Sequence, residues 1–417
     1  MPHTFKMKLI LFFGIVLFAA QPAIANVDSS DVVKAGFSAA ERQYSYMLNQ
    51  CKDLSLYPRS ANPNGQTTFT TIGDWTGGFW PGCLWYVYEY SKDEKWKSAA
   101  IKWTESLEKN QYNRSHHDIG FMMNCSYGNA YRLTQNESYK KILIQSAKSL
   151  ASRYNPRVGA IKSWNIFKSW DGKSIYHFPV IIDNMMNLEL LFLASRLSGD
   201  QRFRDIAIKH AQTTLKNHYR SDYSSFHVVN YDEKTGKVLS KETVQGFSDN
   251  SAWSRGQAWG LYGFTTVYKE TKQKKFLNAA IKMAQFYIHN KNLPSDKIPY
   301  WDFNVGQEGY KPNWNYEASK FQEIPRDASA AAITSSALLE LCKYVKGQQK
   351  DEFYHEARQI LQSLSSDQYT ARPGTNGYFI LKHSVGSIPH GGEIDVPLVY
   401  ADYYYLEALL RFMRFQL

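Results

Sequence analysis

The stretch PVIIDNMMNLELLFLASRLSG, Pro179–Gly199, predicts a strong helix. From Asn184 onward its apolar residues recur at helical spacing, and Gly199 is a natural stop. Asp183 stands just before the helix, where a carboxylate can cap the first free amides and is stabilised by the positive end of the helix dipole. Because apolar residues 180–182 precede it, we expect Asp183 to enter a buried region.

A second carboxylate has the same setting upstream. The stretch HHDIGFMMNCSYGNAYRLTQ, residues 116–135, places Asp118 directly before another amphipathic helix. Two interpretations of such aspartates are open: each is only a helix cap, or both belong to one site. Two carboxylates at the starts of core helices favour a shared site.

Helical patterns dominate the chain, and strand-like alternation is limited to short stretches, of which residues 227–231 and 378–382 are the best. The candidate helices alternate between two types. One type has a charged face, as in TKQKKFLNAAIKMAQFYIHN, and the other is apolar on more than one face, as in DASAAAITSSALLELCKYV. The first type is typical of exposed helices and the second of buried ones. The twelve candidates span residues 31–51, 79–91, 93–109, 119–133, 136–153, 184–198, 200–218, 251–271, 274–290, 327–346, 350–366 and 396–415.

Alternating exposed and buried helices in hairpin pairs form two concentric rings. Twelve helices give six hairpins, which predicts an all-α fold, an (α/α)6 barrel, with residues 26–417 as a single domain. Tandem helical repeats are the alternative fold. Connections that lead into the buried helices are long, and long loops over one end of a barrel are where binding residues are expected. They span residues 111–118, 154–183, 219–250, 291–326 and 366–396.

Residues 1–25 are typical of a secretory signal peptide. Lys6 and Lys8 form a basic region, residues 9–20 form an apolar core too short to span a membrane comfortably, and residues 23–25 are a small-residue cleavage site. No later stretch approaches transmembrane length. We therefore expect export without membrane insertion, most simply into a bacterial periplasm.

The charge balance is basic. The formal net charge is +11, and removing Lys6 and Lys8 leaves +9. An exported basic protein suits an anionic ligand, although a generally basic surface explains the charge equally well. Nucleic acid is the weaker interpretation because no dense Lys/Arg patch or nucleic-acid motif is present. Eleven Trp and 29 Tyr indicate either carbohydrate binding, in which aromatic faces stack on sugars, or a large core.

Metal and common cofactor motifs are missing from the sequence. The four cysteines form no C-x-x-C pair, which argues against zinc. His116 and His117 lack a third ligand at a recognisable spacing, so their neighbour Asp118 suits proton chemistry or hydroxyl recognition better. No G-x-S-x-G elbow, Walker loop or dinucleotide fingerprint occurs. These absences argue against the commonest hydrolases, kinases and dehydrogenases, and the sequence does not predict cysteine pairing or oligomeric state.

Two further segments are dense in polar and aromatic residues. DWTGGFWPG, residues 74–82, opens a helix and places Trp75 where it can form a pocket wall. QGFSDNSAWSRGQAW, residues 245–259, contains Arg255, which can grip a carboxylate with two hydrogen bonds or pack structurally on Trp.

These motifs together resemble glycoside hydrolase family 88, the unsaturated glucuronyl hydrolases. DWTGGFWPGCLWYVYE, HHDIGF, IIDNMMNLELL, WSRGQAWGLYGF, PRDASAAAITSSALLEL and YADYYYLEAL follow in family order over nearly the whole chain after residue 25. The resemblance implies an (α/α)6-barrel catalytic domain, no cofactor, and a substrate left by polysaccharide lyases, with a 4,5-unsaturated uronic acid at its non-reducing end.

The resemblance also assigns roles to residues. Asp183 corresponds to the general acid/base of the family and Asp118 to its second essential carboxylate. Either Trp164 or Trp170 matches a further stacking position. Matching positions around the unsaturated sugar are Trp75, His227, Gln245, Trp253, Arg255 and Trp259.

Substrate preference is the least determined feature. Some relatives that act on sulfated fragments carry S-x-x-S-x-K; Ser384 and Ser387 fit this pattern, but Pro389 stands at the Lys position. The basic charge favours glycosaminoglycan oligosaccharides: heparin, heparan sulfate, chondroitin or hyaluronan fragments. The alternatives are an unsaturated rhamnogalacturonyl hydrolase, a sugar epimerase or isomerase, and a non-catalytic glycan-binding protein.

Overall fold

The computed structural model describes residues 29–170 and 172–416, and its helices match the predicted ones segment by segment. The predicted helix 119–133 is built from α4, a π-helical turn (η2, Asn124–Gly128) and α5. The α-helices are α1 Ser29–Gln50, α2 Phe79–Ser91, α3 Glu94–Glu105, α4 Ile119–Met123, α5 Asn129–Thr134, α6 Glu137–Ala151, α7 Asn184–Ser198, α8 Gln201–Asn217, α9 Ser254–Thr271, α10 Lys274–Ile288, α11 Ala328–Leu341, α12 Gly347–Leu364 and α13 Val399–Gln416.

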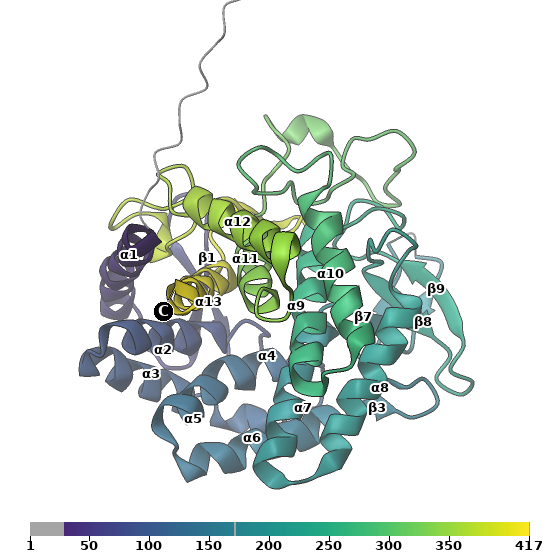
Figure 1. The fold of residues 1–417 in the computed structure, drawn as a ribbon, viewed down its shortest axis with the longest axis horizontal. Helices are drawn as coiled ribbons and strands as arrows, with labels where there is room; N and C mark the ends of the chain where they lie inside the picture. The colour runs from purple at the N-terminus through teal and green to yellow at the C-terminus, as the bar shows by residue number, and fades with distance from the viewer. Residues whose placement is uncertain (1–28, 171, 417) are drawn as a thin grey trace, which may run out of the picture.

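The helices form two concentric rings, so the fold is the predicted (α/α)6 barrel (Figure 1). The inner ring closes through successive contacts of α2, the α4–η2–α5 segment, α7, α9, α11, α13 and again α2. Each inner helix follows an outer helix of its hairpin: α1, α3, α6, α8, α10 and α12. Every residue of α11 is buried, whereas α12 buries only Phe353, Ala357, Ile360, Leu361 and Leu364. The alternation of apolar and charged helices therefore encodes the two rings.

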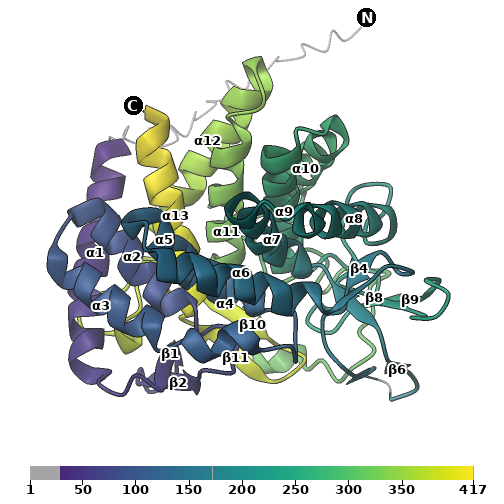
Figure 2. The ribbon, with the colours of Figure 1, turned by 90° about the horizontal axis from the view of Figure 1, so that it is seen from below.

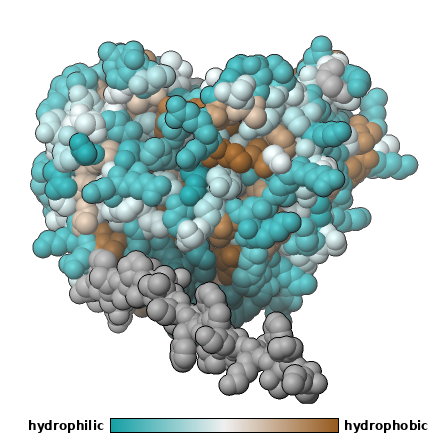
Figure 3. Space-filling view, turned by 90° about the horizontal axis from the view of Figure 1, so that it is seen from above, coloured by the Kyte–Doolittle hydropathy of each residue, from teal (hydrophilic) through white to brown (hydrophobic). Residues whose placement is uncertain are grey.

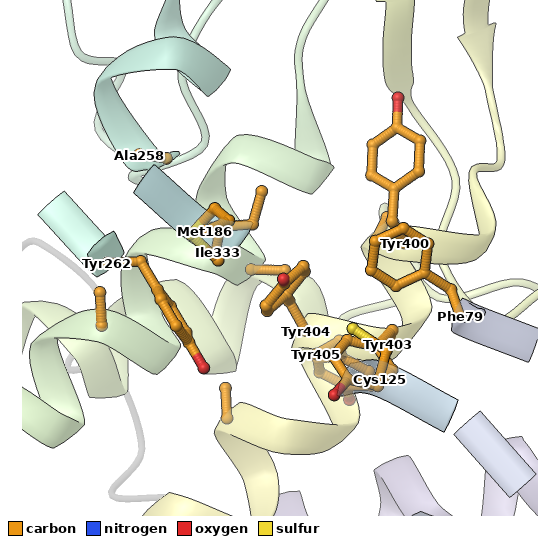
Figure 4. Packing of buried hydrophobic residues seen from close by; sticks show 14 of the residues in the cluster. Phe79, Cys125, Met186, Ala258, Tyr262, Ile333, Tyr400, Tyr403, Tyr404 and Tyr405 are labelled. Carbon is orange, nitrogen blue, oxygen red and sulfur yellow. The ribbon is translucent and has the colours of Figure 1, made fainter. Parts of the chain in front are cut away.

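The core runs through the centre of the inner ring. Figure 4 shows Phe79, Cys125, Met186, Ala258, Ile333 and Tyr404 packed together, one from each of the six inner segments. Tyr403 and Tyr404 of α13 meet edge to face, with ring centroids 5.0 Å apart. Many of the aromatic residues of the chain therefore belong to the core. The side of the molecule in Figure 3 is mainly hydrophilic, as expected where outer helices expose their charged faces.

Short connections lie at one end of the barrel and long ones at the other. The chain turns from α7 into α8 through two residues, and Gly199 there has a φ of 76°, a left-handed conformation that suits glycine. The long connections contain all strands of the described residues, and Figure 2 shows the labelled strands gathered on one side, opposite the C-terminus. The antiparallel strands are β1 Leu56–Ala61, β2 Thr67–Thr71, β3 Tyr154–Asn155, β4 Ala160–Ile161, β5 Phe167–Lys168, β6 Ile175–Tyr176, β7 Pro179–Ile181, β8 Val228–Tyr231, β9 Val238–Glu242, β10 Ser384–Ser387 and β11 Gly392–Val396.

One of the two predicted strands is correct. Residues 227–231 contain β8, which pairs with β7 and places His227 next to Ile182: the Ile182 N–H donates to the His227 carbonyl at 3.0 Å. The prediction for residues 378–382 is wrong. That segment follows a short 3-10 helix (η4, Asn376–Tyr378) and makes only one isolated bridge, between Thr370 and Leu381. Its backbone N–H groups at residues 380 and 381 donate instead to the buried Asp402 carboxylate.

The expected signal peptide, residues 1–25, lies outside the described residues and stays a prediction. Within the part of the chain that is described, no helix combines the length and apolar character needed to cross a membrane.

Candidate active site

Asp118 and Asp183 occupy helix N-cap positions without capping their helices. Asp183 precedes α7 and Asp118 precedes α4, and neither side chain accepts a hydrogen bond from the first turn. By contrast, Asp200 caps α8 by accepting the Arg202 N–H, and Asp327 caps α11 by accepting the N–H groups of residues 329 and 330. The interpretation of Asp118 and Asp183 as simple caps is therefore wrong, and both carboxylates are left for another purpose.

Both carboxylates open into one cavity of about 350 Å³ at the long-loop end of the barrel. They come from neighbouring inner segments, since α4 packs against α7. The other lining residues come from the long loops and from the start of α9. The full lining consists of Trp75, Asp118, Trp164, Phe167, Ile181, Asp183, Val244, Gln245, Arg255 and His390.

Asp183 is held in an environment that favours its protonated form. Burial raises its pKa to about 7, the Arg255 charge opposes this rise, and the Asp118 charge adds to it. Its Oδ2 atom is buried and has no hydrogen-bond partner. At neutral pH a large share of Asp183 therefore carries a proton that it can donate.

Asp118 is held in the opposite state. Burial alone would raise its pKa, but His117, His116 and Arg153 together lower it below the ordinary value. His117 Nε2 lies 3.2 Å from Asp118 Oδ1, and His116 Nδ1 lies 3.2 Å from Asp118 Oδ2. The cavity thus contains one protonated and one ionised carboxyl group, a division typical of acid/base assignments in enzymes.

His227 faces Asp183 in a fixed tautomer. Its Nδ1 accepts the backbone N–H groups of Val244 and Gln245 at 3.0 and 3.2 Å, so its proton is on Nε2. Nε2 lies 3.7 Å from Asp183 Oδ2, too far for a hydrogen bond. Burial lowers the pKa of His227 well below its ordinary value, so the ring is neutral and presents an N–H to the site.

Arg255 lines the cavity, but much of its guanidinium binds protein. Its Nη1 donates to Asp327 at 3.2 Å and to the Val385 carbonyl, and its Nη2 donates to the Gly386 carbonyl at 2.6 Å. The group also stacks on Trp253, 4.5 Å from the ring centroid. Arg255 therefore holds the β10–β11 hairpin at the cavity, and its buried Nε has no partner.

The three expected tryptophans lie in different layers. Trp75 is half-buried and lines the cavity, as expected for a wall. Trp253 is 3% exposed and packs behind the cavity against His227, with ring centroids 4.7 Å apart. Trp259 is fully buried between Phe121 and Tyr404. The last two residues thus support the wall from behind.

The β10–β11 hairpin brings one residue to the cavity that the sequence did not single out, His390. Its Nδ1 lies 2.6 Å from Ser387 Oγ, and Trp170 packs edge-on against it at 4.7 Å between centroids. Ser384 is fully buried outside the cavity lining. Of the two expected serines, Ser387 thus contacts a cavity residue, His390, and Gln245 joins this hairpin by donating to the Gly386 carbonyl at 3.3 Å.

The long loop before α7 supplies the remaining wall. Trp164 lines the cavity, whereas Trp170 lies behind His390 and donates to the Val244 carbonyl at 3.0 Å. Of the two candidates for a stacking position, only Trp164 is part of the cavity lining; stacking itself stays a prediction. Phe167 and Ile181 also line the cavity. In the sequence, only their position in a long loop rich in aromatic residues could have indicated Phe167 and Ile181 as lining residues.

Metal-ligating clusters are not part of this site. No group of three His, Cys, Asp or Glu residues in the described ranges is arranged to hold a metal ion. All four cysteines are buried and free, with no disulfide among them: Cys51, Cys83, Cys125 and Cys342.

Asp183→Asn is expected to stabilise the protein above pH 7. The native state of the wild type retains a proton that the unfolded chain releases above its ordinary pKa of 3.8, so Asp183 costs stability progressively from about pH 4 to 7. Three pKa units correspond to at most about 4 kcal/mol. Urea unfolding at pH 5 and pH 8 measures this; an equal or lower stability of the variant at pH 8 would contradict a raised pKa.

Comparisons with known proteins identify the family. Residues 45–280 match glycosyl hydrolase family 88. The chain is 44% identical over 379 residues to the unsaturated glucuronyl hydrolase of Formosa agariphila, covering 89% of this chain and 90% of that protein. It is 34% identical over 365 residues to the unsaturated chondroitin disaccharide hydrolase of Streptococcus agalactiae, covering 86% of each. A crystal structure of an unsaturated glucuronyl hydrolase specific for heparin matches with a TM-score of 0.85 and 46% identity over 93% of this chain and 98% of that one. The chain therefore belongs to glycosyl hydrolase family 88.

Proposed function

We propose that this glycoside hydrolase removes a 4,5-unsaturated uronic acid from the non-reducing end of oligosaccharides that polysaccharide lyases produce. The observation that carries the proposal is the pairing of a protonated Asp183 with an ionised Asp118 in one cavity. The relatives named unsaturated glucuronyl hydrolase support the same substrate class.

The chemistry differs from that of most glycosidases. Those enzymes protonate the glycosidic oxygen and promote attack at the anomeric carbon. An unsaturated uronide is an enol ether whose electron-rich carbon is C4. Asp183 donates its proton to C4, and positive charge develops at C5 and the ring oxygen. Asp183, now a carboxylate, takes a proton from the water that adds to C5. The resulting hemiketal opens and releases the neighbouring sugar.

Other cavity residues fit supporting roles in this reaction. Asp118 stays ionised and accepts hydrogen bonds from ring hydroxyls. Arg255 and the His227 N–H offer a positive field and a donor near Asp183. Trp75 and Trp164 provide aromatic faces for the sugar.

The epimerase or isomerase alternative fits the site less well. That chemistry on this barrel relies on paired histidines. His117 is fully buried against Asp118 and does not line the cavity, and His227 is held as a neutral donor. An unsaturated rhamnogalacturonyl hydrolase would use the same carboxylates and is distinguished by substrate. A non-catalytic glycan-binding protein would not need both carboxylates.

Asp183→Asn is expected to abolish turnover, because the amide cannot supply the proton. Loss of absorbance near 235 nm from lyase-generated disaccharides measures it. In the wild type, activity should fall as pH rises through about 7, since the protonated fraction of Asp183 falls. Asp118→Asn should move this alkaline limb to lower pH by removing a like charge. Near-normal turnover by Asp183→Asn would refute its role.

Glycosaminoglycan fragments are the substrates that we propose within this class. The net charge of +11 over the whole chain favours anionic sugars. Relatives named for chondroitin disaccharide and heparin point the same way. His390, which lines the cavity with Ser387 bound to it, is the group that we propose to contact the sugar next to the unsaturated uronide.

A disaccharide panel tests this preference. Heparin, chondroitin and hyaluronan disaccharides should be cleaved faster than an unsaturated rhamnogalacturonan disaccharide. His390→Ala should change the ratio of kcat/KM for sulfated and unsulfated disaccharides several-fold, while leaving the alkaline limb of the pH profile in place. A rhamnogalacturonan preference would favour the alternative hydrolase, and an unchanged ratio would exclude His390 from recognition.

Export to a bacterial periplasm is proposed from residues 1–25. Expression of the whole chain in a bacterium should give a mature protein whose N-terminus is Asn26, recovered with the periplasmic fraction. An intact N-terminus in the cytoplasmic fraction would contradict this proposal.

A further inference from the structure

The two helices that follow the carboxylates pack tightly where Gly120 of α4 meets Asn187 of α7. A Cβ atom on residue 120 would lie 2.4 Å from Asn187 Oδ1 and 2.5 Å from its Cα and Cβ. Carbon atoms do not approach so closely, so only glycine allows α4 to lie this near to α7. Gly120 comes two residues after Asp118, and Asn187 comes four residues after Asp183. The contact thus lies about half a helical turn from Asp118 and about one turn from Asp183.

Hydrogen bonds of Asn187 join the same two segments. Its Oδ1 accepts the Phe121 backbone N–H at 2.7 Å, and its Nδ2 lies 3.4 Å from His117 Nδ1. The side chain is completely buried. Asn187 of α7 therefore contacts the segment around α4 both before Gly120, at His117, and after it, at Phe121.

The contact between Asn187 and His117 affects the ionisation of Asp118. Since an amide NH₂ group donates, His117 Nδ1 accepts, and the ring proton is on Nε2. Burial lowers the pKa of His117 to about 4, so the ring is neutral at pH 7. Its Nε2 lies 3.2 Å from Asp118 Oδ1. A side chain of α7 thereby holds the His117 ring beside the carboxylate at the start of α4.

Helix α7 is also confined from another side. A Cβ atom on Gly263 of α9 would lie 2.5 Å from Met185 Cβ. The first turn of α7 therefore has glycine contacts with both α4 and α9. Because α9 limits its movement, a larger residue at position 120 has to displace α4 from α7.

We propose that Gly120 and Asn187 form a spacer that sets the separation of Asp118 and Asp183, and that both act as positioning residues for the reaction. Separation decides how strongly the charge on Asp118 favours the protonated form of Asp183. The inference rests on the proposed function, in which Asp183 is the proton donor.

Gly120→Ala tests the spacer through kinetics and pH. A displaced α4 should lower kcat about 10- to 100-fold. The alkaline limb of the kcat/KM profile should move to lower pH, because a more distant Asp118 no longer favours protonation of Asp183 as strongly. A second variant, Asn187→Ala, removes both hydrogen bonds with less steric disturbance. It should move the acid limb of the profile, set by Asp118, to higher pH, because the His117 ring that lowers the pKa of Asp118 is no longer held in place.

Gly36→Ala is the control for packing alone. A Cβ atom there would lie 2.4 Å from Leu409 Cδ1 in the contact of α1 with α13, a clash with the end of a flexible side chain and therefore milder than the one at Gly120. It should lower the melting temperature while leaving both pH limbs where they are in the wild type.

If Gly120→Ala and Asn187→Ala lose stability but keep the wild-type pH limbs, Gly120 and Asn187 only contribute packing, and the spacer proposal is refuted. If Gly120→Ala does not fold, Asn187→Ala decides alone. Wild-type protein that fails to cleave any unsaturated disaccharide would refute the proposed function instead.

Discussion

The site depends on keeping two buried carboxyl groups in different protonation states. Ionising two carboxyl groups in one desolvated cavity is unfavourable because both lose solvation and repel each other, so their surroundings decide which one is ionised. Two histidines and Arg153 favour charge on Asp118, while burial and the neighbouring charge favour the proton on Asp183. This difference turns a pair of similar side chains into an acid and an anion with separate tasks.

The barrel supplies the conditions for that difference. Both carboxylates lie at the starts of inner helices, at the end of the barrel where the long loops supply most of the cavity lining. The β10–β11 hairpin is tied to the barrel by Arg255, which is itself paired with the buried Asp327. Arg59 binds Glu393 of the same hairpin and Asp74 beside the Trp75 wall. Ion pairs thus link, beside the cavity, segments that are far apart in the sequence.

Much of this architecture could be predicted from the sequence, because it follows from local pattern. The alternation of charged and apolar helices gave the rings, and the positions of Asp118 and Asp183 before apolar helices indicated a shared site. The resemblance to the family supplied their roles. Features that depend on tertiary contacts could not be predicted in this way. The segment 378–382 alternates like a strand, yet its N–H groups bind Asp402 from a distant helix.

The same limit applies to individual side chains. The sequence left open whether Arg255 binds a carboxylate or packs on a Trp; in the structure it stacks on Trp253, and backbone carbonyls of a distant hairpin accept hydrogen bonds from it. His390 had no distinctive motif, and only the hairpin turn brings it to the cavity. Ser384 matched a family pattern and is nevertheless fully buried.

Titration of Asp183 itself would test this account most directly. Isotope-edited infrared or carbon NMR spectroscopy of labelled aspartate, assigned by comparison with Asp183→Asn, would follow its carboxyl signal from pH 4 to 9. We expect a protonation midpoint near pH 7, with Asp118 ionised throughout that range. A midpoint near 4 for Asp183, or a protonated Asp118 at neutral pH, would contradict the division of roles between the two carboxyl groups.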